Sequence, residues 1–257
     1  MSENTSHPII EEQEEAMTFW EHLDVLRSSI IRMLLVVGVT TIVAFFFKDT
    51  LFNIVLAPSK SEFITYRLMG AEAFSIQLVN IGLTEQFMIH LKTACYFGVI
   101  IAAPFILYLL YQFIRPALYQ NERRYTLSVV GSSYLMFIIG TIIDYFIIFP
   151  LTVRFLGTYS VSEDVQNMLS LQSYMDTLLM MSLVFGIIFE LPVISWLLAK
   201  FGIIKAEWMQ KYRRHAIVVI LIIAAIITPT SDIFTLSIVS LPIWLLYELS
   251  IFIVKRT

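Results

Sequence analysis

The stretch 126-TLSVVGSSYLMFIIGTIIDYFII-148 runs for 23 residues and contains a single charged side chain, Asp144. A helix needs about 20 mostly apolar residues to cross the hydrocarbon core of a bilayer. The whole chain has 257 residues, of which 58% are hydrophobic and 14% are charged. A soluble domain of this length cannot bury so much apolar surface. The sequence therefore predicts an all-α integral membrane protein.

Five further apolar segments have the same character as 126–148. They are Ile30–Phe47, Ala94–Tyr111, Leu178–Leu198, Ala216–Ile227 and Ile233–Val254. Residues 216–227 rise only about 18 Å at 1.5 Å per residue, and the turn at 228–232 joins them directly to the last segment. We expect six transmembrane helices, with a short fifth and sixth forming a hairpin. Kinks are expected at prolines within or beside the spans: Pro104, Pro150, Pro192 and Pro242.

The basic residues predict the orientation of these spans. Six crossings place both termini and the loops 112–125 and 200–214 on one side, which holds twelve of the 17 Lys and Arg residues. The positive-inside rule makes that side cytoplasmic. Residues 1–17 are acidic and predicted to be flexible, and residues 18–257 are predicted to form one transmembrane domain. The loops 48–85 and 151–176 on the other side are long enough for a structured cap.

Catalytic chemistry has no visible basis in the sequence. The four histidines are scattered, no Gly-rich phosphate loop occurs, and the single cysteine, Cys95, reads as a buried inert thiol. No enzyme activity, cofactor, metal or nucleic-acid partner is expected. A small-solute transporter or channel is the alternative function. It would require several facing polar residues within the spans or two similar halves, and neither is visible.

The residues that precede the first span are predicted to form an amphipathic helix. Residues 18–21 (TFWE) form a capping box, and Phe19, Leu23, Leu26 and Ile30 share one apolar stripe. Glu21, Asp24 and Arg27 lie off this stripe and face solvent or a partner. Anchoring in the membrane interface alone would also explain the pattern.

Several stretches, in order along the chain, resemble TatC, the multispanning subunit of the twin-arginine protein translocase. They are 19–27 (FWEHLDVLR), 56–58 (LAP), 84–85 (TE) with Lys92, 103–108 (APFILY), 113–124 (FIRPALYQNERR), 189–192 (FELP), and 228–229 (TP) with Asp232. Each stretch alone is weak evidence for the family, whereas the whole set in this order is specific for it. The resemblance implies a protein of the bacterial cytoplasmic membrane that binds twin-arginine signal peptides of folded precursors. It also implies assembly with single-span TatA/TatB-type subunits, other copies of itself and lipid, driven by the proton motive force.

The resemblance also implies roles for particular residues. Glu122 matches the principal recognition carboxylate, a group that can pair with guanidinium in bidentate geometry. Phe113, Arg123 and Arg124 belong to the same cytoplasmic groove, with Asp24, Glu21 and Arg27 in support. The family's second carboxylate and second arginine fall on Val25 and Ser29 in this chain, which departs from the pattern. Structural or loop positions are carried over to Pro58, Glu85, Lys92, Pro104, Pro116 and Asp232.

Glu190 lies within the fourth predicted span. An ionised carboxylate is costly there, and intramembrane acids usually mark functional sites. The resemblance implies that Glu190, with Pro192, forms a polar site for a partner's transmembrane helix. The alternative is a protonated Glu190 bonded to backbone freed by Pro192. A proton relay has no second acid of comparable depth in the sequence, and Asp144, which departs from the family pattern, receives no role.

Overall fold

The computed structural model describes residues 19–70, 76–114, 126–159, 168–228 and 232–256. Five stretches of these residues are helical, long and apolar enough to cross a membrane. They are α1 (Phe19–Phe45); α4 (Glu85–Ile114); α5 (Thr126–Ile143) continued by the π-helical segment η4 (Asp144–Ile148) and α6 (Phe149–Thr158); α7 (Leu171–Ile188) followed by α8 (Leu191–Lys200); and α11 (Ile233–Arg256). This confirms the first four predicted spans and the last one.

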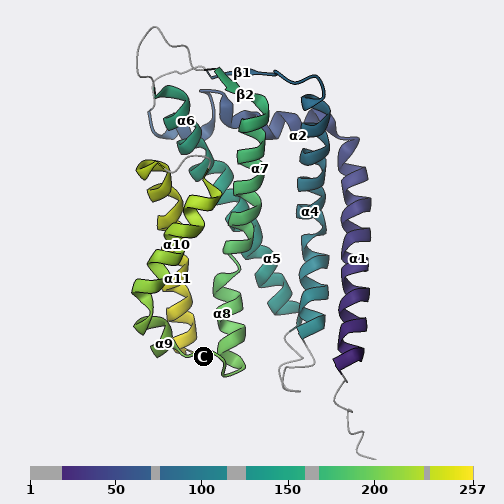
Figure 1. The fold of residues 1–257 in the computed structure, drawn as a ribbon, viewed down its shortest axis with the longest axis vertical. Helices are drawn as coiled ribbons and strands as arrows, with labels where there is room; N and C mark the ends of the chain where they lie inside the picture. Colours follow the sequence, from purple (N-terminus) through teal and green to yellow (C-terminus); the bar gives the residue numbers. More distant parts are fainter. Residues whose placement is uncertain (1–18, 71–75, 115–125, 160–167, 229–231, 257) are drawn as a thin grey trace, which may run out of the picture.

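The fifth predicted span corresponds to α10 (Arg213–Ile227), which follows the short helix α9 (Ala206–Lys211). Its 15 residues rise about 22 Å, so α10 is short, as predicted. The prediction of a short sixth helix is wrong, because α11 has 24 residues and rises about 36 Å. It continues through Pro242 and ends at Lys255 and Arg256. The end of α10 and the start of α11 nevertheless lie below the level that α7 reaches (Figure 1).

A cap covers one end of the bundle, which we call the cap end (Figure 1). Before α4, the chain forms α2 (Lys48–Val55), η1 (Ala57–Ser59), α3 (Ile64–Leu68) and strand β1 (Gln77–Val79). Strand β2 (Met168–Ser170) precedes α7 and pairs in parallel with β1, with Leu78 opposite Leu169. The predicted structured cap is therefore confirmed, and this two-stranded sheet is a small departure from an all-α fold. Helix α1 begins and α11 ends at the opposite end of the bundle.

The prolines act differently on their helices. Helices α4 and α11 remain continuous through Pro104 and Pro242. In contrast, the helix is interrupted between α7 and α8, two residues before Pro192, and η4 ends just before Pro150. Proline removes one backbone donor, which a long packed helix can tolerate. The expectation of a perturbed helix thus holds for Pro192 and Pro150.

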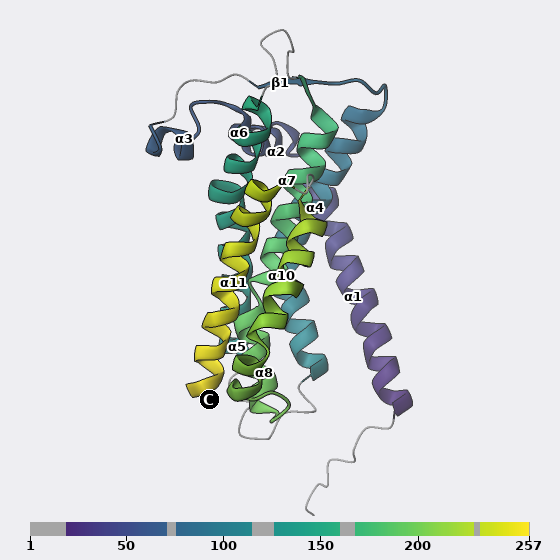
Figure 2. The ribbon, with the colours of Figure 1, turned by 60° about the vertical axis from the view of Figure 1, so that its left-hand side comes forward.

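Small residues let the long helices approach closely. Helix α1 lies along α4 (Figure 2), and the Thr40 hydroxyl lies 2.9 Å from the carbonyl oxygen of Gly98. A Cβ atom on Gly98 would be 2.4 Å from Thr41 Oγ1 and 2.8 Å from the Thr41 backbone nitrogen. Between α5 and α7, a Cβ on Gly140 would be 2.6 Å from the carbonyl oxygen of Phe185. Close backbone approach at such residues replaces the hydrophobic effect as the force that joins helices in lipid.

This packing predicts that Gly98→Ala destabilises the protein. The added methyl group must push α1 from α4, because part of what it meets is Thr41 backbone, and overpacking of this kind costs about 1–3 kcal/mol. The melting temperature of the purified full chain in detergent should fall. Gly131→Ala in α5 is the matched control, since nothing lies within 4 Å of its Cβ position, and alanine stabilises a helix interior. Equal melting temperatures for the two variants would contradict this account.

Candidate functional site

Several residues that the sequence assigned to signal-peptide binding lie outside the described part of the structure. These are Glu122, Arg123 and Arg124, together with Pro116 of the same loop. Their roles therefore stay predictions. The described chain reaches this loop from both sides, because α4 ends at Ile114 and α5 begins at Thr126.

The remaining residues of that predicted site lie on α1 and at the end of α4. Asp24 and Arg27 are exposed, and Phe113 is half-buried. Glu21 belongs to the first turn of α1. The start of α1 and the end of α4 lie at the same end of the bundle, opposite the cap (Figure 1). The fold thus brings the two elements together as the topology predicted.

The departures from the family pattern on α1 have a structural counterpart. Ser29, where an arginine was expected, is only 8% exposed, and Val25 is half-buried. Arg27 and Arg32 are exposed. A buried position between two exposed arginines suits a small serine better than a guanidinium, which needs water or an ionic partner. The exposed charged side chains of this part of α1 therefore include Asp24, Arg27 and Arg32.

Glu190 lies at the interruption between α7 and α8. Its backbone N–H donates to the carbonyl oxygen of Ile187 at 3.0 Å, and its carbonyl oxygen accepts from the N–H of Ile194 at 2.9 Å. The side chain is 7% exposed, and Oε1 has no hydrogen-bond partner among the described residues. Lys200, which ends α8, is about 15 Å further along the helix. Glu190 is thus a buried acid within the span whose hydrogen-bonding capacity is not used up.

Glu190 lines a cavity of about 480 Å³ between α4, α5, α7 and α8. Three residues of the lining carry polar side chains, namely Tyr111, Ser133 and Glu190, and the others are apolar. A polar atom held in apolar surroundings without a partner is unfavourable. A donor on an incoming helix would relieve this cost, because both groups otherwise lack hydrogen bonds in lipid. The cavity can therefore accept apolar side chains of a neighbouring helix together with one polar side chain.

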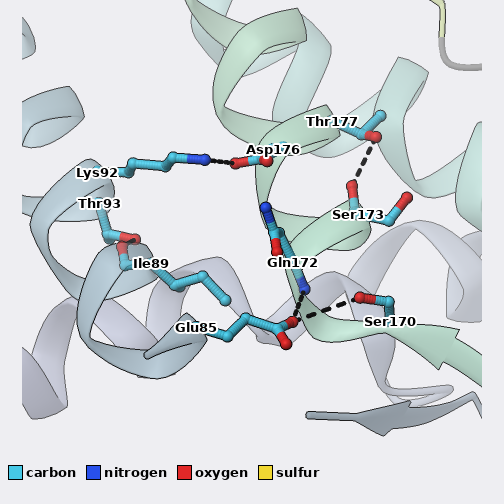
Figure 3. Close-up of polar contacts among 9 residues, drawn as sticks. All are labelled: Glu85, Ile89, Lys92, Thr93, Ser170, Gln172, Ser173, Asp176 and Thr177. Carbon is cyan, nitrogen blue, oxygen red and sulfur yellow. Dashed lines mark hydrogen bonds and ion pairs between the residues drawn. The ribbon is translucent and has the colours of Figure 1, made fainter. Parts of the chain in front are cut away.

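At the cap end, Glu85 joins the starts of α4 and α7 (Figure 3). Its Oε2 atom accepts from the backbone N–H groups of Ile81 at 3.1 Å and Gly82 at 2.7 Å. Its Oε1 atom accepts from the backbone N–H of Gln172 at 2.8 Å and from the Ser170 hydroxyl at 3.4 Å. One buried carboxyl therefore ties together two segments that lie 87 positions apart in the chain.

Lys92 extends this connection between the same two helices. Its ammonium lies 2.6 Å from Oδ1 of Asp176 on α7, with the two side chains 42% and 40% exposed (Figure 3). The sequence analysis carried Lys92 over as a structural position and did not find Asp176 as its partner. Glutamate and aspartate are common near helix starts, so nothing in the local pattern distinguished Asp176.

Two further predicted structural positions, Pro58 and Asp232, lie at a turn and at a helix cap. Pro58 is buried in η1, and its carbonyl oxygen lies 2.9 Å from the hydroxyl of Tyr66, a residue whose pKa is raised by burial. Asp232 precedes α11, and its Oδ1 accepts from the N–H of Thr235 at 2.8 Å, which caps the helix. Cys95 is exposed on α4 rather than buried. That prediction was wrong because an apolar neighbourhood in sequence does not tell which face of a membrane helix points outward.

No group of three or more potential metal ligands occurs among the described residues. The fold and this geometry define a class: a helical membrane protein with several crossings, a cap at one end, and a buried acid that lines an apolar cavity. A family model described as Sec-independent protein translocase protein (TatC) matches residues 21–242. The chain belongs to the TatC family, which is a protein-translocase family and not an enzyme family.

Individual relatives and solved structures agree with this assignment. The Sec-independent protein translocase protein TatC of Desulforapulum autotrophicum is 36% identical over 93% of this chain and 84% of its own length. The TatC protein of Carboxydothermus hydrogenoformans is 33% identical over 95% of both chains. A crystal structure of the twin-arginine translocase receptor TatC superposes with a TM-score of 0.79 at 34% identity, covering 92% of this chain and 99% of that one.

The Glu85 network predicts that Glu85→Ala loosens the cap end. The substitution leaves the backbone amides of Gly82 and Gln172 without their carboxylate acceptor, so the segments on either side of the cap lose the hydrogen bonds that join them. Amide hydrogen exchange should therefore accelerate in residues 77–84 and 168–172. Lys92→Met is the control on the same helix, because an exposed ion pair contributes only about 0–1 kcal/mol. Exchange in Glu85→Ala no faster than in Lys92→Met would show that Glu85 does not hold the cap.

Proposed function

We propose that this chain is the receptor subunit of a twin-arginine protein translocase, which binds the signal peptides of folded precursor proteins and nucleates assembly of the proton-motive-force-driven complex. The observation that carries the proposal is the likeness to the twin-arginine translocase receptor along 92% of the chain. The chain thereby acts in protein transport across a membrane as a multi-pass component of the translocase.

We place the protein in the bacterial cytoplasmic membrane with six crossings and both termini in the cytoplasm. Two observations support this topology. The first helix begins and the last helix ends at the same end of the bundle, which requires an even number of crossings if both helices span. Lys255 and Arg256 end α11 on that side, as the positive-inside rule demands. The short α10 then serves as the fifth crossing.

The signal peptide would bind at the end opposite the cap, between the start of α1 and the loop after α4. Glu122 pairs with the arginines of the peptide, with Asp24 and Glu21 in support, and Phe113 provides an apolar wall. Arg27, Arg123 and Arg124 set the surrounding positive charge and so favour a single register of the peptide. The exposure of Asp24 and Arg27 supports their availability to a ligand.

The partners of the complex would be single-span TatA/TatB-type subunits and other copies of this chain, within membrane lipid. The cavity beside Glu190 is the docking site for a partner helix. Its apolar lining matches a transmembrane helix, and the free Oε1 atom offers an acceptor to a polar side chain. Pro192 supports the site by keeping α7 and α8 separate where Glu190 turns into the cavity.

Photo-crosslinking of a twin-arginine signal peptide to the full chain in membranes tests the recognition site. Glu122→Ala should reduce crosslinking at least ten-fold, whereas Asp24→Asn and Glu21→Gln should each reduce it less. A charge-assisted hydrogen bond contributes about 1.5–3 kcal/mol, and losing that free energy weakens binding by roughly ten-fold or more. A Lys-Lys precursor is the matched peptide control. Undiminished crosslinking in Glu122→Ala would refute the assignment of Glu122.

Co-purification with a single-span partner tests the Glu190 site. Glu190→Leu should weaken the complex by about three-fold to twenty-fold, the range expected for one interhelical hydrogen bond in lipid. Glu190→Gln keeps an acceptor and a donor and should retain most of the binding. Glu207→Gln on α9, at an exposed position, controls for loss of a negative charge. Equal recovery of the partner with Glu190→Leu and Glu207→Gln would exclude docking at Glu190.

A further inference from the structure

Asp144 is the most deeply buried carboxyl group of the described residues. Its side chain is 0% exposed, against 7% for both Glu85 and Glu190. It opens the π-helical segment η4, where the N–H of Phe149 donates to the Asp144 carbonyl oxygen five residues earlier. Single π-helical turns inside helices occur frequently at functional sites. Neither carboxyl oxygen of Asp144 makes a hydrogen bond of normal geometry among the described residues, although the Ser182 hydroxyl lies near enough to interact with the carboxyl.

Two hydroxyl groups lie beside this carboxyl. Ser182 of α7 is 1% exposed and faces Asp144, and its Oγ lies 2.6 Å from the hydroxyl oxygen of Tyr96 on α4. Three helices therefore contribute one polar side chain each to a single buried point: Asp144, Ser182 and Tyr96. We call these three residues the Asp144 cluster.

No cation compensates a negative charge at Asp144 within the described residues. On α4 and α7, the helices that supply Tyr96 and Ser182, Lys92 is paired with Asp176. Arg67 of α3 is exposed and Arg154 of α6 is half-buried, and no ion pair joins either of them to Asp144. Tyr145 is the adjacent titratable group, and its hydroxyl donates to the carbonyl oxygen of Ile54. An isolated buried carboxylate is strongly disfavoured, so the group takes up a proton instead.

We propose that the Asp144 cluster is an intramembrane proton-binding site, at which the Asp144 carboxyl holds an exchangeable proton. The ligand is H⁺ itself: one carboxylate oxygen gains the proton and the group becomes neutral. This site is separate from Glu190, because Ser182 and Glu190 lie eight residues apart on one helical run, about 12 Å along its axis. The proposal does not depend on the proposed function of the chain.

The proton reaches the cluster from the cap end. Tyr96 follows Lys92 by four residues, and Ser182 follows Asp176 by six, so the two hydroxyls lie about 6–9 Å deeper than the exposed Lys92–Asp176 pair. Each hydroxyl can accept one proton while it passes on its own. The order along the route is the Lys92–Asp176 pair, then Tyr96, then Ser182, and finally a carboxyl oxygen of Asp144. Each of these steps moves one proton and leaves both hydroxyls unchanged.

Infrared spectroscopy of the purified full chain, with ¹³C in the aspartate side-chain carboxyls, tests the site. Among the buried carboxyls of the described residues only Asp144 is an aspartate, so a label in aspartate distinguishes it from Glu85 and Glu190. We expect a protonated-carboxyl band at neutral pH that shifts with the label, is absent in Asp144→Asn and persists in Glu190→Gln. Absence of a label-sensitive band, or its survival in Asp144→Asn, would overturn the proposal.

The access route is tested by the shift of the same band after transfer to D₂O. Ser182→Ala should move the band, because a hydroxyl beside the carboxyl is lost, and should slow its shift in D₂O at least ten-fold. Tyr96→Phe should also slow the shift that follows transfer to D₂O. It should move the position of the band itself less than Ser182→Ala does. These two variants keep Asp144, so they also identify the band if Asp144→Asn fails to fold. An unchanged band and an unchanged exchange rate in both variants would rule out the cluster as the proton site.

Discussion

Backbone amide and carbonyl groups have no water to bond within the hydrocarbon core, and the rest of this structure depends on that constraint. Each spanning stretch must satisfy its own polar backbone, so helices are required there. Irregular backbone appears inside the spans at two described places, the turn at Glu190 and the π-helical segment at Asp144. Both places are enclosed by other helices and both carry a buried carboxyl. Departures from regular helix are thus confined to positions where protein, not lipid, surrounds the chain.

The cap holds the long helices in register at one end of the bundle. Short helices and strands meet in the cap, including α3 with five residues and the strands β1 and β2 with three residues each. None of them would be stable alone. Glu85 and Tyr66 connect them to the long helices, and Lys92 joins α4 to α7; all three do so through partners distant in sequence. The proposed signal-peptide site lies at the opposite end, where α1 begins and α4 ends.

Three buried carboxyls illustrate how burial and partners divide the roles of one chemical group. Glu85 accepts three backbone amides and therefore acts as a structural crosslink. Glu190 lines an apolar cavity with an unused acceptor and suits an external partner. Asp144 is sealed among helices, with hydroxyls as its neighbours, and suits a proton. The role of an acidic side chain within a membrane protein cannot be assigned from its depth in the bilayer alone, because the hydrogen-bonding groups around it decide what it can bind.

The sequence by itself determined the class of fold, most of the spans, the short α10 and the family, because hydropathy, caps and ordered motifs are local properties. It also located Glu190 within a span. The tertiary structure decided what the local pattern does not contain: the partnership of Lys92 with Asp176, the parallel pairing of β1 with β2, and the meeting of Asp144, Ser182 and Tyr96. It also corrected the burial of Cys95 and the length of α11. These features depend on how helices rotate and slide against one another, and that register is set by packing between residues more than 80 positions apart.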